Sequence, residues 1–478
     1  MGVIWVNCGG RLPKMNANLL DLLHKIANTP NAPYLYSASR DLIKQILVNA
    51  QIPELSIGQD EFALYARVKR GNPKKQLIVI THIDHPAIVL KNSKYGIAFG
   101  SVGYERISQN LSSSPIPVKI YDSTGNFQQL AHVHHFAIKR GIPIVSINAS
   151  KPVLSNSHAI WDVPPIEQNN GVIKMQNADN GAVTAVALQL LIDSTEFNDI
   201  DLQVVFVYVE EVHQIASTGI AERGSTPFGK INKDTIIINL EAMEVEISDI
   251  EKGLIQELNL PCPKYDGGVL IKVNDGQLVY GFQFTKTENQ AELLVKHVAE
   301  IENINHQYTI STGSTDAKSF SLFPLTPHIV TLAIPCKWKH NHGANGEFIP
   351  EEIYEQDLYN TLAILKLAVN KASSISSQKI LFSLSHELKK RNYGLSSKQA
   401  DELRKQRSRL MKAAQPRLKK EKYFDSTLLE FIEFNYWRVA SKFVSLKAKS
   451  GLTKRAPDVW DSAASQAEST PKQNPAPK

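Results

Sequence analysis

Several apolar runs along this chain end on charged or imidazole side chains. The runs are residues 77–81, 202–209, 236–240 and 329–333, and the side chains that close or follow them are His82, Glu210, Glu211, Glu241 and His340. Apolar runs of this length are typical of buried strands. Burying an unpaired carboxylate is costly, so a buried strand that ends on one usually delivers it to a metal or a substrate. The pattern therefore predicts a buried sheet whose strand ends carry chemistry.

Helical patterns alternate with these strands. Residues 19–48 indicate two helices on either side of a proline-containing stretch at 30–33, and residues 182–191 indicate a helix that opens on the turn Asp179-Asn180-Gly181. Residues 351–369 indicate a further helix after the last strand. Such alternation predicts an α/β fold.

The pattern of apolar and polar residues changes between residues 91 and 174. Short β-rich runs there are broken by Ser, Pro and Gly, and no helical periodicity is present. We expect a small β-rich domain at residues 91–174, inserted into a domain made of residues 1–90 and 175–372. His132, His134 and His135 of this segment invite a metal site, but we interpret them as exposed histidines of a strand.

Positive charge is concentrated near the C-terminus. Residues 386–420 carry 12 Lys or Arg and 3 Asp or Glu, a surplus of 9, whereas the whole chain is +6, which leaves −3 for the rest. We expect a basic helical extension at residues 373–455, with helical character at 388–418 interrupted by Gly394 and Pro416, an aromatic-rich run at 428–446, and a disordered tail at 456–478. The basic segment is either a solvated face or a surface for RNA, anionic lipid or an acidic partner.

Composition narrows the class of protein. With 478 residues, 42% hydrophobic and 21% charged, the chain is ordinary for a soluble globular protein. No run approaches the roughly 20 apolar residues of a membrane helix, and the first residues lack the basic segment of a signal peptide. The three cysteines are few and widely spaced, so we expect no disulfide framework and a cytoplasmic location.

Five of the polar candidates form a chemically coherent set. They are His82, Asp179, Glu211, Glu241 and His340. Each alone has an ordinary alternative, a polar strand end or a simple turn. Together, two imidazoles and three carboxylates suit two borderline divalent ions, Zn²⁺ or Co²⁺, bridged by one shared carboxylate. Alternation along the strand also places Asp84 on the same face as His82, where it could hold the imidazole ring.

The order and spacing of these motifs resemble those of the M42 metallopeptidases, the glutamyl and deblocking aminopeptidases, over about residues 19–370. The matching segments are His82-Ile-Asp84-His85, Asp179-Asn180-Gly181, Glu210-Glu211-Val212, Ser314-Thr-Asp316-Ala317 and the interval from Ile334-Pro335 to His340. The resemblance implies a mixed sheet flanked by helices, as in zinc aminopeptidases, with an inserted small β domain. It also implies a peptide substrate and a homo-oligomer.

The resemblance further implies a role for each matching residue. His82 and Glu241 would hold one metal ion, Glu211 and His340 the other, and Asp179 would bridge them. Glu210 would be the general base and Asp84 the partner of His82. A cis peptide bond would follow Asp179. Asp316 would belong to the pocket for the substrate amine, although a helix N-terminal cap is an equally good interpretation.

The chain also departs from the family pattern. Gly181, His213 and His85 replace the residues usual in the family, and His342 is a rival to His340 as a ligand. The preferred function is a two-metal aminopeptidase. The alternatives are a related N-acyl amino acid deacylase or carboxypeptidase, and a non-catalytic scaffold or RNA-associated protein on the same fold.

Overall fold

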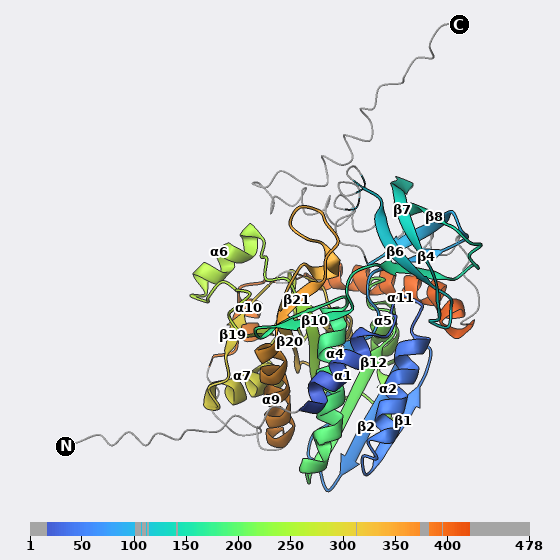
Figure 1. Ribbon diagram of the computed structural model, residues 1–478. Coiled ribbons are helices and arrows are strands. Elements are labelled where there is room, and N and C mark those ends of the chain that lie inside the picture. Colours follow the sequence, from blue (N-terminus) through green and yellow to red (C-terminus); the bar gives the residue numbers. More distant parts are fainter. Residues whose placement is uncertain are drawn as a thin grey trace, which may run out of the picture.

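Figure 1 shows the computed structural model of the chain. It describes residues 17–100, 107, 111, 114–139, 142–311, 313–372, 382–393 and 395–420. The aromatic-rich run at 428–446 and the tail at 456–478 lie outside the described residues.

A mixed β-sheet forms the centre of the fold. Its strands run in the order β1 (Leu55–Gln59), β2 (Ala63–Arg70), β12 (Ile200–Val207), β3 (Leu77–His82), β15 (Ile236–Met243), β20 (Ile329–Lys337), β21 (Glu351–Tyr354), β11 (Val172–Met175) and β10 (Ile166–Asn169). Strand β16 (Val269–Lys272) also pairs with β20 and, on its other side, with β19 (His306–Thr309). The central strands β12, β3, β15 and β20 are mutually parallel and largely apolar. Their carboxyl ends therefore meet at one edge, where open α/β sheets usually bind ligands.

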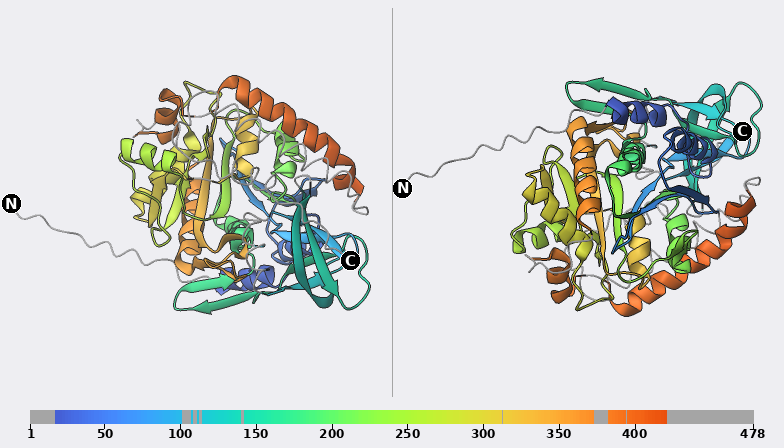
Figure 2. Two further views of the ribbon diagram at one scale, coloured as in Figure 1. Left: turned by 90° about the horizontal axis from the view of Figure 1, so that it is seen from above. Right: turned by 90° about the horizontal axis from the view of Figure 1, so that it is seen from below.

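Helices cover both faces of this sheet. Helix α4 (Ala178–Ile192) packs on β15 and β3, and it also contacts α1 (Ala17–Ala27) and α9 (Glu355–Lys371). Its residues 178–191 are all buried. A helix that is apolar on all sides is expected in such a position. Figure 2 shows α5 (Ile215–Arg223) and α8 (Asp316–Leu322) on the opposite side of the sheet from α1. Helix α7 (Gln290–Ile301) packs beside α9, and α2 (Ser37–Asn49) contacts α4.

Several smaller elements also belong to the described part of the chain. They are α6 (Asp249–Glu257), the 3₁₀ turn η1 (Asp193–Glu196), and two short hairpins, β13 (Ser225–Thr226) with β14 (Gly229–Lys230) and β17 (Asn274–Asp275) with β18 (Leu278–Val279). The expected α/β class, with a mixed sheet flanked by helices, is confirmed.

One boundary prediction was wrong. Residues 351–369 were expected to be a single helix, but residues 351–354 form β21 and the helix begins only at Glu355. The strand pairs antiparallel with both β11 and β20. These partners are distant in the sequence, so the pattern of a short segment next to a helix could not reveal them.

A closed barrel lies beside the sheet. It consists of β4 (Ala87–Leu90), β5 (Tyr95–Phe99), β8 (Ile142–Ala149), β7 (Phe127–Lys139), β6 (Ile116–Tyr121) and β9 (His158–Trp161). A core of its own, including Ile88, Val118 and Trp161, fills the interior. His132, His134 and His135 are exposed on β7, as expected. The hairpin β10–β11 joins the main sheet instead, and the domain bounds 91–174 stay a prediction.

His158 of the barrel should make stability depend on pH. It is buried, its Nε2 lies 3.1 Å from the carbonyl oxygen of Pro33, and burial lowers its pKa from 6.5 to about 4. The folded protein keeps this imidazole neutral, whereas the unfolded chain binds a proton below pH 6.5. The stability contribution is therefore present above that pH and is lost as the pH falls towards 4.

We expect the wild type to lose about 2 kcal/mol more than His158→Gln between pH 7 and pH 5. The free energy of unfolding in urea at the two pH values measures this difference. The exposed His132→Gln serves as the control and should follow the wild type. Parallel losses for all three proteins would contradict the assignment to His158.

The basic extension is partly docked on the body. Helix α10 (Leu384–Lys390) begins where the carboxylate of Glu292 accepts the backbone N–H groups of Leu384 and Ser385 at 2.5 and 3.3 Å. Helix α11 (Ser397–Lys420) packs against α5 and α8, and Figure 2 shows it along the outer side of the molecule. The expected interruption at Pro416 is wrong, because α11 continues through it. A proline removes one hydrogen bond from a helix but does not always end it.

Among the helices of the described residues, none is long and apolar enough to cross a membrane.

Candidate active site

The polar residues predicted from the strand ends converge at the carboxyl edge of the parallel strands. In chain order they are His82 at the end of β3, Asp179 at the start of α4, Glu210 and Glu211 after β12, Glu241 near the end of β15, and His340 in the short helix η2 (Lys339–Asn341) after β20. All except Glu211 are buried, and Glu211 is half-buried.

Asp179 lies between the two imidazoles. Its Oδ1 is 3.4 Å from His82 Nε2, and its Oδ2 is 3.1 Å from His340 Nε2. On the outer sides, His82 Nε2 is 3.5 Å from Glu241 Oε1, and His340 Nε2 is 3.3 Å from Glu211 Oε1. The arrangement thus has the connectivity expected of a bridging carboxylate with one imidazole and one further carboxylate on each side.

The donor atoms of this cluster fit a divalent metal ion. Buried atoms that make no hydrogen bond include His82 Nε2, Asp179 Oδ1, Glu211 Oε1 and Glu241 Oε2. Buried polar atoms normally have hydrogen-bond partners. Several ligand atoms without one that face each other therefore indicate a site for a cation. Atoms of His82, Asp179 and Glu211 lie within 4.8 Å of one another. Imidazole nitrogen and carboxylate oxygen are ligands that Zn²⁺ and Co²⁺ accept.

The electrostatics of the cluster favour cations. Burial on its own would lower the pKa of His340, but Glu211 and Asp179 raise it to about 10. Burial opposes protonation of His82 in the same way, yet its carboxylate neighbours, Asp179 foremost, raise its pKa well above the usual value. Three carboxylates in a buried space therefore create a strongly negative centre.

A lysine of the chain reaches into this centre. Lys339 Nζ lies 3.0 Å from Asp179 Oδ2 and 3.2 Å from Glu241 Oε1, and its side chain is only 20% exposed. Burial would lower the pKa of Lys339, but the carboxylates of Asp179, Glu241 and Glu211 outweigh it and raise the pKa well above its usual range. Lys339 was not among the residues predicted for the site, although it directly precedes His340 in the sequence.

Two buried carboxylates hold the backbone of the cluster in place. Asp84 accepts the backbone N–H groups of Glu210 at 2.9 Å and of Glu211 at 3.1 Å, and its Oδ1 is 3.5 Å from His82 Nδ1. Asp84 thus lies beside His82, as predicted, and its hydrogen bonds to Glu210 and Glu211 also fix the turn after β12. Glu351 accepts the backbone N–H groups of Asp179 at 2.8 Å and of His340 at 2.6 Å. Sequence reasoning missed Glu351.

The peptide bond between Asp179 and Asn180 is cis, as the resemblance implied. Asn180 donates to the carbonyl of Leu240 at 2.9 Å and to Thr81 Oγ1 at 3.1 Å. His85 Nδ1 hydrogen-bonds with the carbonyl oxygen of Asp179, and its Nε2 lies 3.0 Å from Asn341 Oδ1. These contacts anchor the start of α4 to the end of the neighbouring strands.

The similarity of this chain to known proteins lies in its fold. No family model matches the sequence, and no curated protein matches it. Among solved structures, an aminopeptidase of the archaeon Desulfurococcus kamchatkensis has a TM-score of 0.55 and 15% identity, over 76% of this chain and 99% of its own. A TET peptidase of Pyrococcus horikoshii, described as assembling into a tetrahedron or a large octahedral shell, has a TM-score of 0.54 and 13% identity, over 73% and 99%. A TET aminopeptidase of a marine sediment archaeon of the Thaumarchaeota has a TM-score of 0.55 and 13% identity, over 74% and 96%.

This chain has the fold of these aminopeptidases. The expected structural resemblance is therefore confirmed at the level of the fold, over nearly the whole length of the neighbours.

Within this aminopeptidase fold, Glu210 is joined to the C-terminal extension. Its Oε1 accepts a hydrogen bond of 2.9 Å from Gln214 Nε2. The amide oxygen of Gln214 in turn accepts from the guanidinium of Arg407 in α11, which also donates to Ser319 Oγ at 2.7 Å. Arg407 is only 5% exposed. The basic segment is therefore not simply a solvated face, because at least one of its cations is buried behind the candidate base.

Burial raises the pKa of Glu210 well above its usual range. His82 acts in the opposite direction, while the charges of Glu211 and Asp316 add to the rise. A carboxyl group in such surroundings binds a proton more readily than an exposed glutamate, as a general base requires.

Asp316 is the first residue of α8 and is buried, and Thr315 precedes it as the cap residue. Burial raises its pKa to about 7, against the opposing charge of His82. No side-chain hydrogen bond caps the start of α8, so the alternative of a capping Asp316 has no support. A buried carboxyl group close enough to influence Glu210 is suitable for a cationic group of a substrate.

The structure distinguishes His340 from His342 as a candidate metal ligand. His340 faces Asp179 and Glu211, whereas the ring of His342 packs edge-on against Phe348, with centroids 5.0 Å apart. His213 lies in the turn before α5, and burial lowers its pKa to about 3.

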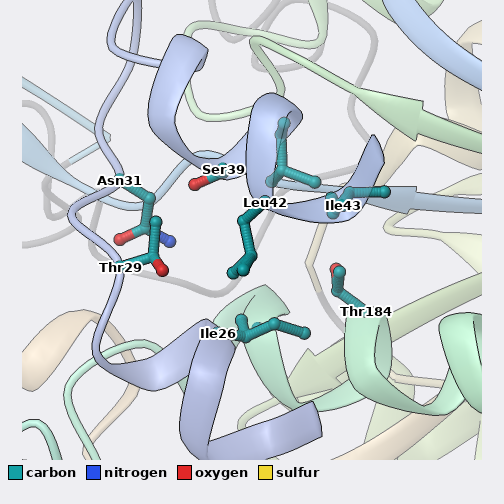
Figure 3. A pocket seen from close by; sticks show the side chains of 9 residues that line it. Ile26, Thr29, Asn31, Ser39, Leu42, Ile43 and Thr184 are labelled. Carbon is teal, nitrogen blue, oxygen red and sulfur yellow. The ribbon is translucent and has the colours of Figure 1, made fainter. Parts of the chain in front are cut away.

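A small, mostly apolar pocket lies next to the first turns of α4 (Figure 3). Ile26, Leu42, Ile43 and Thr184 are among the residues that line it, between α1, α2 and α4. None of the candidate metal ligands lines it. Thr184 Oγ1 donates to the carbonyl of His82 at 3.1 Å. The pocket therefore borders a residue that supports His82, and it does not border the reacting groups.

Proposed function

We propose that this protein is a metallo-aminopeptidase of the M42 type, which hydrolyses the N-terminal residue from peptides. The observation that carries the proposal is the convergence of His82, Asp179, Glu211, Glu241 and His340 in one buried cluster, with Glu210 beside it. The aminopeptidase fold of the structural neighbours supports the same conclusion.

The chain's own residues supply binding and proton transfer. A divalent ion bound at the cluster would polarise the scissile carbonyl and lower the pKa of a water molecule. Gln214 orients Glu210 by holding its Oε1. Glu210 accepts the proton of the attacking water on its other oxygen and returns it to the nitrogen of the leaving amine, so the proton count balances. During this exchange, Asp84 fixes the backbone of Glu210 and Glu211, and Glu351 fixes the backbone of Asp179 and His340.

Asp316, on the acidic side of the site, would select substrates with a free amino terminus. Asp316 carries a carboxyl group in a buried position, where burial disfavours its charged form. An ammonium group would satisfy it, whereas an N-acyl group would leave it unpaired at a cost of about 1–3 kcal/mol. We therefore infer that the substrate is recognised through its α-amine.

A panel of aminoacyl-anilides and their N-acetylated counterparts tests this function. After addition of Zn²⁺ or Co²⁺, we expect hydrolysis of the free-amine compounds and at least about tenfold lower kcat/KM for the acetylated ones. Preference for the acetylated compounds would instead indicate an N-acyl amino acid deacylase. Absence of turnover with both series would indicate a non-catalytic protein on this fold.

Three further properties rest on the sequence and the neighbours. The assembly described for the Pyrococcus horikoshii peptidase supports a homo-oligomer. Binding of RNA or an acidic partner through the exposed cations of α11, such as Lys405 and Arg409, stays a prediction. The cytoplasmic location also stays a prediction.

A further inference from the structure

The ammonium group of Lys339 contacts the carboxylates on one side of the cluster. Its Nζ is 3.0 Å from Asp179 Oδ2 and 3.2 Å from Glu241 Oε1. With His82, these two carboxylates are the ligands that the resemblance to the M42 enzymes implies for one of two metal ions. The other side of the cluster consists of Asp179, Glu211 and His340, and among the described residues no ion pair within 4 Å joins Lys339 to Glu211.

The backbone directs Lys339 towards this position. Its neighbours Trp338 and His340 both have left-handed φ values, 60° and 61°, which make a tight turn after β20. The backbone N–H of His340 is held by Glu351 at 2.6 Å, so the turn is fixed next to Lys339. Lys337, two residues earlier, provides a contrast because its Nζ binds Glu352 at 3.2 Å and its side chain is 41% exposed.

A metal ion and the ammonium group compete for the same oxygens. Carboxylate oxygens bind Zn²⁺ at about 2.0–2.2 Å. An ion bound jointly by Asp179 and Glu241 would therefore lie close to Lys339 Nζ, where the two positive charges repel each other in a poorly solvated space. Within the described residues, the ligand atoms that all lie within 4.8 Å of one another belong to His82, Asp179 and Glu211, so neither Glu241 nor His340 belongs to this group.

We propose that this centre binds a single divalent ion at Asp179 and Glu211, with imidazole ligands, and that the ammonium of Lys339 takes the place of a second ion between Asp179 and Glu241. This inference rests on the proposed metallo-aminopeptidase function. It replaces the two ions expected from the sequence by one ion and one fixed cation of the chain. The ammonium would also be a hydrogen-bond donor towards an oxygen atom of the substrate, a role that a second metal ion would otherwise fill.

Metal counting tests the proposal without relying on activity. The full-length protein is stripped with a chelator, reloaded with excess Zn²⁺, separated from free metal by gel filtration, and analysed for zinc per chain by mass spectrometry. We expect about one ion in the wild type and about two in Lys339→Met, since Met has a similar length but no charge. Lys339→Arg keeps the charge and should stay near one.

Lys337→Met is the matched control, because it removes a neighbouring lysine that binds Glu352 outside the cluster. It should bind as much zinc as the wild type. Two tightly bound ions in the wild type would overturn the inference while leaving the proposed function intact. One ion in a folded Lys339→Met would also overturn it. No zinc in any of the four proteins would remove both the inference and the metal-dependent function.

Discussion

Glu210→Gln should lower kcat for free-amine anilides by about 10²- to 10⁴-fold, the usual contribution of a general base. The amide cannot accept the proton of the attacking water, but it has almost the same shape and can still bond to Gln214. Glu210 is not needed as a metal ligand in this arrangement, so zinc per chain should be unchanged. Combined measurement of kcat, KM and zinc content separates loss of the base from loss of the metal.

Glu302→Gln is a suitable control for this substitution. Glu302 lies exposed at the C-terminal cap of α7, so the same chemical change there should leave kcat unaltered. If Glu210→Gln retains more than about a tenth of the wild-type kcat, Glu210 is not the base, because even a weak general base contributes more than this. Loss of zinc in the variant would instead assign Glu210 to the metal.

Arg407→Leu should lower kcat by about tenfold or more, with little change in KM. Arg407 is a positioning residue, since it holds Gln214, which in turn donates to Glu210. Removing the guanidinium leaves the buried amide oxygen of Gln214 without a charged donor, and hydrogen bonds to charged groups contribute about 1.5–3 kcal/mol. A misoriented base affects the chemical step, whereas substrate binding depends on groups elsewhere in the site.

Two variants distinguish positioning from a general effect on stability. Arg404→Leu removes another arginine of α11, one that pairs only with Asp401 on the same helix among the contacts described, and should leave kcat unchanged. Arg407→Lys retains a cation and should recover part of the lost rate. Equal losses in kcat for the Arg404 and Arg407 variants, or an unaltered kcat in Arg407→Leu, would show that α11 does not act through Glu210.

The sequence by itself determined the buried α/β core and the main candidate residues of the site. Buried strands are recognisable as apolar runs. A single carboxylate or imidazole at the end of one run has ordinary explanations, but several of them at the ends of runs across one α/β core indicate shared chemistry. For this reason His82, Glu211 and Glu241 could be named before their distances were known. The order of the motifs supplied Asp179 and His340 as well as the fold.

Only the tertiary structure decided which other side chains reach these residues. Lys339 reads as an ordinary surface lysine beside His340, and nothing in the sequence shows that its ammonium lies between two carboxylates. Glu351 and Arg407 are distant in the chain from the groups they hold, Asp179 and Gln214. Local patterns report periodicity and propensity along the chain, whereas contacts of this kind depend on how separate elements pack. The sequence therefore determined the candidate ligands, and packing decided which cation of the chain lies among them.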